Sequence, residues 1–190
     1  MAGSKPVVGV LALQGDIDQH RDILEQLGCE VVLVKKPEQL NDIKGLVLPG
    51  GESGAMLRML RPDGFLEILQ ASNLPILGTC AGAILLAKTV ENPPQESLEK
   101  IPITIIRNGY GRQTDSFDDT VTTTDDVVQH VSARFIRAPI ISDYDEDVEI
   151  LAVYDDKPVA VRYDHYLATT FHPELTGELY FHRLFLKLLQ

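Results

Sequence analysis

Residues 74–88, LPILGTCAGAILLAK, join a short apolar run to a helical pattern through a turn of small residues. The apolar run 74–77 predicts a buried strand, and the pattern over 83–88 predicts a helix. Between them, residues 78–82 have the form G-x-C-x-G, which is typical of a nucleophile elbow when a strand precedes it and a helix follows. Small neighbours allow Cys80 a strained backbone without clashes. The stretch therefore predicts an α/β fold that presents a cysteine at the end of a strand.

The preceding part of the chain repeats the alternation of strand and helix. Continuous apolar runs, typical of strands buried on both faces, occupy residues 7–13, 30–34 and 45–48. Helical patterns lie at 17–27, 56–60 and 65–69. Short strands that alternate with helices predict a parallel sheet covered on both faces.

The second half is richer in strands. Strand-like segments occupy residues 103–106, 121–124, 135–136, 148–154, 159–163 and 167–171, and an amphipathic helix is predicted at 179–189. Residues 155–158, DDKP, have the composition of a hairpin turn. The polar loop 89–100 is too short to link two domains. We therefore expect one domain over residues 1–190.

Composition excludes several classes of protein. The 190 residues are 44% apolar and 24% charged, as in an ordinary globular protein. The net charge of −11 argues against a nucleic-acid partner. The apolar runs are too short to cross a membrane, and the N-terminus lacks the apolar run of a secretory signal. Two cysteines, Cys29 and Cys80, make no disulfide framework, so a cytoplasmic location is expected.

Cys80 is the candidate nucleophile. At a helix N-terminus, partial positive charge favours the thiolate. The backbone N–H of Ala81 is placed to help bind an oxyanion. The alternative is a buried core cysteine, which is the interpretation for Cys29 because it lacks such a context.

A thiol nucleophile needs a base, and His172 is the best placed of the five histidines. It follows the strand 167–171 and heads the sequence His-Pro-Glu. A residue before proline is extended, and continued extended geometry would project His172 and Glu174 to the same side. Glu174 would then orient the imidazole toward Cys80. The alternative is a surface His-x-Glu pair. His20 and His182, on helices, are expected to face solvent or an interface.

Residues 49–53, PGGES, form a third element at a strand end. Two glycines let backbone amides approach a ligand closely. A nucleotide site is disfavoured because the lysine of the phosphate-binding loop is missing. A plain turn is the alternative, but ligand sites of open α/β sheets gather at the carboxyl ends of strands.

Together these residues resemble a class I (triad) glutamine amidotransferase. More narrowly they resemble the PdxT/SNO family, the glutaminase subunits of pyridoxal 5′-phosphate synthase. The matching segments follow the family order through nearly the whole chain, at residues 9–15, 36–40, 48–53, 78–82, 107–108, 111–113, 115–117, 135–139 and 171–175. The resemblance implies a three-layer, mostly parallel open sheet flanked by helices, of the flavodoxin-like kind.

The resemblance also implies the site. Its triad would be Cys80, His172 and Glu174, and no metal or organic cofactor is expected. The glutamine site would be lined by Gly51, Glu52, Ser53, Arg107, Ile136 and Arg137, with Gly51 and Ala81 at the oxyanion. A guanidinium suits the α-carboxylate of glutamine, and Glu52 suits its ammonium group. A core salt bridge is the alternative for either arginine.

By the same resemblance, L-glutamine is hydrolysed to L-glutamate and ammonia through a γ-glutamyl thioester. Ammonia would pass to a PdxS/SNZ-type (β/α)8-barrel synthase subunit in a twelve-plus-twelve complex that makes the vitamin B6 coenzyme. The chain departs from the family pattern at Gln19 and at Gly54-Ala55, outside the triad. A stand-alone cysteine hydrolase, such as a γ-glutamyl hydrolase or a PfpI-like protein, and a regulatory subunit that binds glutamine without turnover are the alternatives.

Overall fold

The computed structural model describes residues 5–107, 109, 116–125 and 128–190. The strands are β1 (Val7–Leu11), β2 (Glu30–Val34), β3 (Gly45–Leu48), β4 (Ile76–Thr79), β5 (Ala87–Glu91), β6 (Ile101–Ile106), β7 (Phe117–Thr123), β8 (His130–Phe135), β9 (Ile140–Tyr144), β10 (Glu149–Tyr154), β11 (Lys157–Tyr163) and β12 (Tyr166–Thr169). The α-helices are α1 (Ile17–Gln26), α2 (Ser53–Leu60), α3 (Phe65–Ala71), α4 (Ala81–Leu86) and α5 (Tyr180–Lys187), and the 3-10 helices are η1 (Pro37–Asp42), η2 (Pro62–Gly64) and η3 (Pro173–Leu175).

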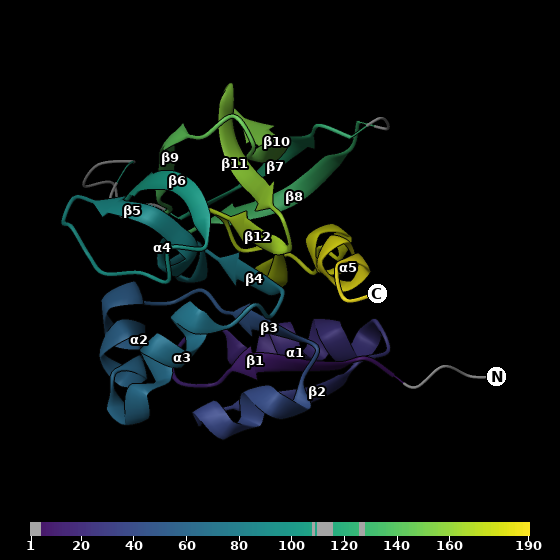
Figure 1. Ribbon diagram of the computed structural model, residues 1–190. Coiled ribbons are helices and arrows are strands. Elements are labelled where there is room, and N and C mark those ends of the chain that lie inside the picture. Colours follow the sequence, from purple (N-terminus) through teal and green to yellow (C-terminus); the bar gives the residue numbers. More distant parts are fainter. Residues whose placement is uncertain (1–4, 108, 110–115, 126–127) are drawn as a thin grey trace.

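The strands of the large sheet are paired in parallel in one half and antiparallel in the other. Nine strands follow the order β2-β1-β3-β4-β12-β11-β10-β7-β8 (Figure 1). Pairing is parallel from β2 to β12 and antiparallel from β12 to β8. Strands β5, β6 and β9 form a second, smaller sheet. The α/β prediction is confirmed, and β12 brings the end of the chain back beside β4.

Two cores cover the two faces of the large sheet. One contains buried side chains of α2, α3 and α4, such as Met56 and Leu66, together with residues of the small sheet. The other contains Leu24 of α1 and Phe181 and Phe185 of α5. Figure 1 shows α2 and α3 together at one side of the molecule and α5 at another. The layered arrangement follows from continuous apolar strands that bury both faces.

The strand and helix predictions hold for most segments, with local corrections. The helix predicted at 83–88 ends at Leu86, because Ala87 and Lys88 begin β5, which pairs with β6. Strand β9 was not predicted, because three of its five residues are exposed and polar or aromatic, which weakens its apolar pattern. Of the short segment predicted at 135–136, only Phe135 is strand, as the last residue of the longer β8, and Ile136 lies in the loop that follows.

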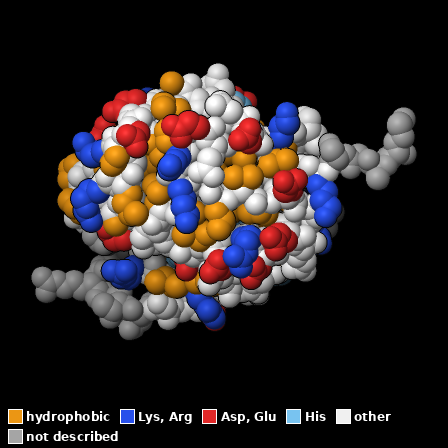
Figure 2. Space-filling view, turned by 90° about the horizontal axis from the view of Figure 1, so that it is seen from below, with side chains coloured by type: hydrophobic (Ala, Val, Ile, Leu, Met, Phe, Trp, Pro, Cys, Tyr) orange, Lys and Arg blue, Asp and Glu red, His pale blue; other side chains and the backbone are white. Residues whose placement is uncertain are grey.

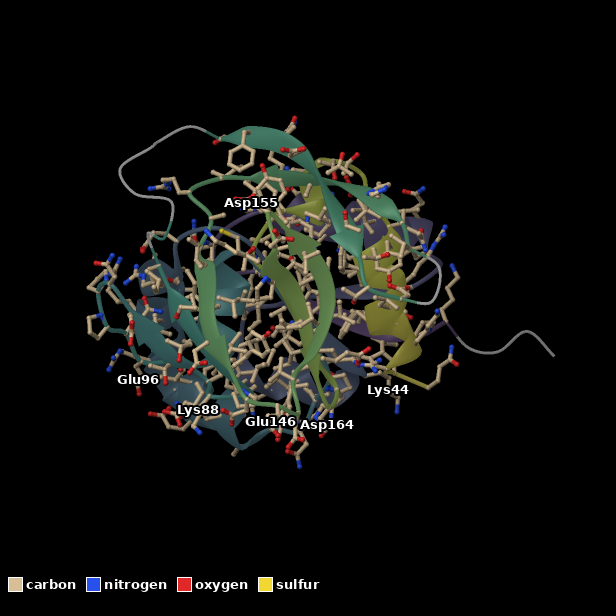
Figure 3. The ribbon with its side chains drawn as sticks, turned by 90° about the horizontal axis from the view of Figure 1, so that it is seen from above. Lys44, Lys88, Glu96, Glu146, Asp155 and Asp164 are labelled. Atoms are coloured by element: carbon tan, nitrogen blue, oxygen red, sulfur yellow. The ribbon has the colours of Figure 1, made fainter. Side chains whose placement is uncertain are left out.

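The predicted hairpin turn at 155–158 is confirmed. Asp155 and Asp156 have φ of 49° and 58° and join β10 to β11. Asp164, with φ of 53°, occupies the next tight turn, between β11 and β12. Figure 3 shows Asp164 at the lower edge of the molecule. Aspartate tolerates this left-handed backbone better than most residues.

The surface mixes charges of both signs. In the view of Figure 2, acidic and basic side chains are interspersed with small apolar areas. Among the residues that the structure describes, no helix is long and apolar enough to cross a membrane.

Gly82 lets α4 pack directly on β3. A Cβ added to Gly82 would lie 2.1 Å from the backbone oxygen of Leu48. We expect Gly82→Ala to lower the free energy of unfolding by about 1–3 kcal/mol, the usual cost of overpacking, in urea denaturation. Gly54→Ala in α2 is the matched control, because its Cβ would meet no backbone atom and only the ends of two side chains, Glu52 at 3.2 Å and Gln95 at 3.7 Å. The control should stay within about 1 kcal/mol of wild type. Equal stability of the Gly82→Ala protein and wild type would contradict this packing.

Candidate active site

A cavity of about 290 Å³ lies where the carboxyl ends of β1, β3 and β4 meet the loop after β8. Its lining residues are Gln14, Asp16, Gly51, Glu52, Ser53, Cys80, Ile84, Arg107, Ile136, Arg137 and His172. It thus brings together Cys80, His172 and all six residues expected to contact glutamine. Strand ends are where open α/β sheets bind ligands.

Cys80 occupies the sharp turn that the sequence predicted. It joins β4 to α4 with φ of 48° and ψ of −98°, a backbone that a non-glycine residue adopts only at a cost. Its N–H donates to the Thr169 oxygen at 2.8 Å, and its carbonyl accepts from the Ile84 N–H at 3.1 Å. Its Sγ lies 3.8 Å from the Ile136 oxygen. Hydrogen bonds to β12 and α4 therefore hold the strained turn.

His172 and Glu174 are in contact, although by a different geometry from the one predicted. His172 Nδ1 lies 2.8 Å from Glu174 Oε1. The prediction of an extended backbone after His172 is wrong, because Pro173 begins the 3-10 helix η3. The His172 N–H donates to the Arg134 oxygen of β8 at 2.8 Å, which anchors the loop to the sheet.

The two residues carry opposite charges. Burial lowers the pKa of His172, but hydrogen bonds with Asp16, Cys80 and Glu174 outweigh it and raise that pKa to about 12. Burial raises the pKa of Glu174, while His20 and His172 hold it well below its ordinary value. The site therefore places a positively charged imidazole beside two carboxylates and the Cys80 sulfur, which is how cysteine hydrolases pair an acid–base group with a nucleophile.

Asp16 is a site residue that the sequence reasoning missed. Its Oδ2 lies 3.2 Å from His172 Nδ1, the nitrogen that also contacts Glu174. Its backbone N–H donates to the Gly50 oxygen at 3.1 Å. Gln14 and Ile84 were also missed. Gln14 follows β1, and Ile84 lies in α4. These positions could have identified both residues, since β1 ends and α4 begins at the edge of the sheet where the site was predicted.

The glycine pair permits close approach, as expected. A Cβ on Gly50 would lie 2.2 Å from His172 Cε1, and one on Gly51, whose φ is 150°, would lie 2.6 Å from Gln14 Oε1. The Gln14 Oε1 accepts the Glu52 N–H at 2.8 Å. Neither glycine has room for a side chain, so the loop lies directly against the histidine.

Glu52 and Arg107 form the rim of the cavity. The Glu52 carboxylate accepts the N–H groups of Gly54 and Ala55, at 3.1 Å and 2.6 Å, and so caps α2. Arg107 Nη2 lies 3.5 Å from Glu52 Oε1. Because the Glu52 side chain is 47% exposed, this ion pair is not in the core. Ser53 is buried and donates to Gln95 at 3.1 Å.

Other motif positions can be placed only in part. Arg137 lines the cavity with φ of 42°. Ala81 follows Cys80 at the start of α4. The motif residues Asn108, 111–113 and Asp115 lie outside the described residues.

The prediction that His20 and His182 face solvent or an interface is wrong. Both side chains are fully buried, because they lie on the sides of α1 and α5 that pack toward the sheet. His20 Nδ1 lies 2.9 Å from His182 Nε2. The helical pattern placed His20 with apolar residues, and this was the signal for burial.

Asp16, His172 and Glu174 could also hold a cation by position, since their ligand atoms lie within 4.8 Å of one another. A cation at His172 Nδ1 would displace the proton that joins this nitrogen to Glu174. The three residues are better described as an imidazole whose Nδ1 proton is hydrogen-bonded to carboxylate oxygens.

Comparisons with known proteins show the family of the chain. Residues 10–190 match the SNO glutamine amidotransferase family. The chain is 49% identical over 186 residues to the protein named pyridoxal 5′-phosphate synthase subunit PdxT of Koribacter versatilis, covering 96% of this chain and 95% of that one. The protein of the same name from Thermotoga maritima is 47% identical over 186 residues, covering 96% and 99%. A solved structure described as a glutamine amidotransferase superposes with a TM-score of 0.88 at 40% identity, covering 96% and 98%.

Asp16→Asn tests the charge balance at His172. Replacing the carboxylate by an amide should lower the pKa of His172, which NMR titration of its imidazole would measure. The folded pKa lies above the unfolded value of 6.5, so this interaction stabilises the protein fully below that pH and is lost as pH rises toward about 12. Asp16→Asn should therefore lower the free energy of unfolding more near about pH 6 than near about pH 10.

Asp18→Asn is the matched control for this titration. Asp18 lies in the same helix region but pairs with the exposed Arg21 at 2.8 Å. Its replacement should leave the His172 titration unchanged. An unchanged titration in the Asp16→Asn protein would remove Asp16 from the electrostatics of the site.

Proposed function

Because the chain belongs to the SNO glutamine amidotransferase family, we propose that Cys80, His172 and Glu174 are its catalytic triad. The protein is a glutaminase that supplies ammonia for the synthesis of pyridoxal 5′-phosphate. The observation that carries the triad assignment is the cavity itself. There a strained cysteine and a histidine hydrogen-bonded to a buried carboxylate meet over a space large enough for one small amide.

In the first half of the reaction the Cys80 thiolate attacks the γ-amide carbon of glutamine. His172 uses Nδ1 toward Glu174, which leaves Nε2 for Cys80 and the leaving group. The imidazolium donates its proton to the departing nitrogen, the C–N bond breaks, and ammonia leaves behind a γ-glutamyl thioester.

In the second half a water molecule attacks the thioester carbonyl. The now neutral His172 takes a proton from that water, the C–S bond breaks, and glutamate leaves. The Cys80 thiolate and the imidazolium are thereby restored. Throughout, the Glu174 carboxylate keeps the imidazole oriented and stabilises its charged form.

The rim residues supply recognition. Gly51, Glu52, Ser53, Arg107, Ile136 and Arg137 contact glutamine, and N–H groups of Gly51 and Ala81 bind the oxyanion. Arg107 and Glu52 lie 3.5 Å apart at the rim, and the Glu52 side chain is 47% exposed, so a substrate that carries the opposite charges can reach both groups. A guanidinium binds the α-carboxylate in bidentate fashion, and Glu52 binds the α-ammonium group.

A synthase subunit is the partner, as the names of the relatives imply. The more detailed proposal is a (β/α)8-barrel synthase in a twelve-plus-twelve complex that receives the ammonia. Residues 1–190 act as one glutaminase domain, and the two free cysteines suit a cytoplasmic location.

Ammonia release from glutamine, with and without the synthase subunit, tests the triad. Cys80→Ala should abolish release, because no other thiol lines the cavity among the described residues. His172→Asn should lower kcat about 10²–10⁴-fold, the usual contribution of a general acid–base. Cys29→Ala is the matched control and should keep wild-type turnover, since Cys29 lies in the core beside α1. Normal ammonia release by the Cys80→Ala protein would overturn the mechanism.

A further inference from the structure

We propose that His20, supported by His182, is a positioning residue that holds the Glu174 carboxylate in place behind His172. The inference rests on the proposed triad and extends it by a second layer of side chains from α1 and α5. Neither helix lines the cavity.

The contacts form one continuous chain. His182 Nε2 lies 2.9 Å from His20 Nδ1, and His20 Nε2 lies 3.1 Å from Thr79 Oγ1. The Thr79 hydroxyl lies 3.3 Å from Glu174 Oε1, and His20 Nε2 lies 3.5 Å from the same oxygen. His172 Nδ1 lies 2.8 Å from that same oxygen. Glu174 Oε1 is therefore shared by the base of the reaction and by His20, which in turn contacts His182.

Burial makes these contacts important for Glu174. The side chains of His20, His182 and Thr79 are fully buried, and Glu174 is 5% exposed. Within the described part of the chain, Glu174 Oε2 has no hydrogen-bond partner. A buried carboxylate that lacks donors is costly. The negative charge of Glu174 thus depends on the donors at Oε1.

One arrangement of protons satisfies every link. His182 donates from Nε2 to His20 Nδ1, His20 donates from Nε2 to Thr79, and Thr79 donates its hydroxyl proton to Glu174. Burial lowers the pKa of His182 to about 3, so His182 is neutral and its Nε2 can carry the donated proton. Each of the three donors then gives its proton to the next group in the series, which ends at the Glu174 carboxylate.

The series of hydrogen bonds from His182 to Glu174 also includes the residue next to the nucleophile. Thr79 is the last residue of β4 and directly precedes Cys80. His20 therefore contacts both the residue that leads into the elbow and the residue that orients the base. Two imidazoles in the core would cost stability relative to apolar side chains of similar size, and positioning the triad explains why they are there.

The experiment compares His20→Leu with His20→Gln in the complete complex with the synthase. Leucine removes both ring nitrogens, whereas the glutamine amide can still donate from about the position of Nε2. We expect His20→Leu to lower kcat for glutamine hydrolysis about 10- to 100-fold, the effect usual for outer-shell partners, with KM for glutamine unchanged. His20→Gln should recover most of the lost kcat.

Thr79→Val provides a second route if His20→Leu folds poorly. It removes the hydroxyl link while keeping a side chain of the same shape, and it should also lower kcat without changing KM. Thermal unfolding of each variant separates instability from loss of positioning. Cys80→Ala, measured alongside, checks the triad itself.

Wild-type kcat in folded His20→Leu and Thr79→Val proteins, with Cys80→Ala inactive, would overturn the positioning role and leave the triad intact. Equal loss of kcat in His20→Leu and His20→Gln would also overturn it, because the donor would then be irrelevant. An active Cys80→Ala protein would instead reject the proposed triad.

Discussion

The hydrogen bond between His172 Nδ1 and Glu174 Oε1, 2.8 Å long and almost wholly buried, is the contact on which the site depends. In the proposed mechanism it leaves the other ring nitrogen for Cys80, and together with Asp16 and Cys80 it keeps a positive charge on the imidazole in the core. A lone buried charge of either sign would be unstable, so the pair has to form together. The surrounding structure brings the two residues into contact and buries them away from water.

The sheet performs most of this positioning. Strand β12 pairs with β4 in parallel, so the chain segments that carry Cys80 and His172 leave the sheet side by side at the same edge. The bond from Cys80 N–H to Thr169 joins these two strand ends directly, at 2.8 Å. The His172 backbone is tied to β8 in addition. Residues ninety-two positions apart in the sequence, at 80 and 172, are thus placed together by pairing between neighbouring strands.

The sequence was informative where chemistry depends on local pattern. The elbow around Cys80, the glycine pair before Glu52 and the His-Pro-Glu sequence each have a signature within a few residues, and the structure brings all three to one cavity. Asp16, His20 and His182 carry no such signature, because their roles arise from packing between α1, α5 and strand ends distant in the sequence. The contact of His172 with Glu174 was predicted for an incorrect reason, since a proline can begin a 3-10 turn as readily as it can prolong an extended segment.

The most direct measurement of the central claim is to trap the covalent intermediate. Wild-type protein in complex with the synthase would be mixed with glutamine, quenched in acid during turnover, and digested for mass spectrometry. The mechanism predicts a γ-glutamyl thioester on the peptide that contains Cys80, and its accumulation should increase when hydrolysis of the thioester is slowed. Sustained turnover with no adduct on that peptide, or with the adduct on another residue, would contradict the account.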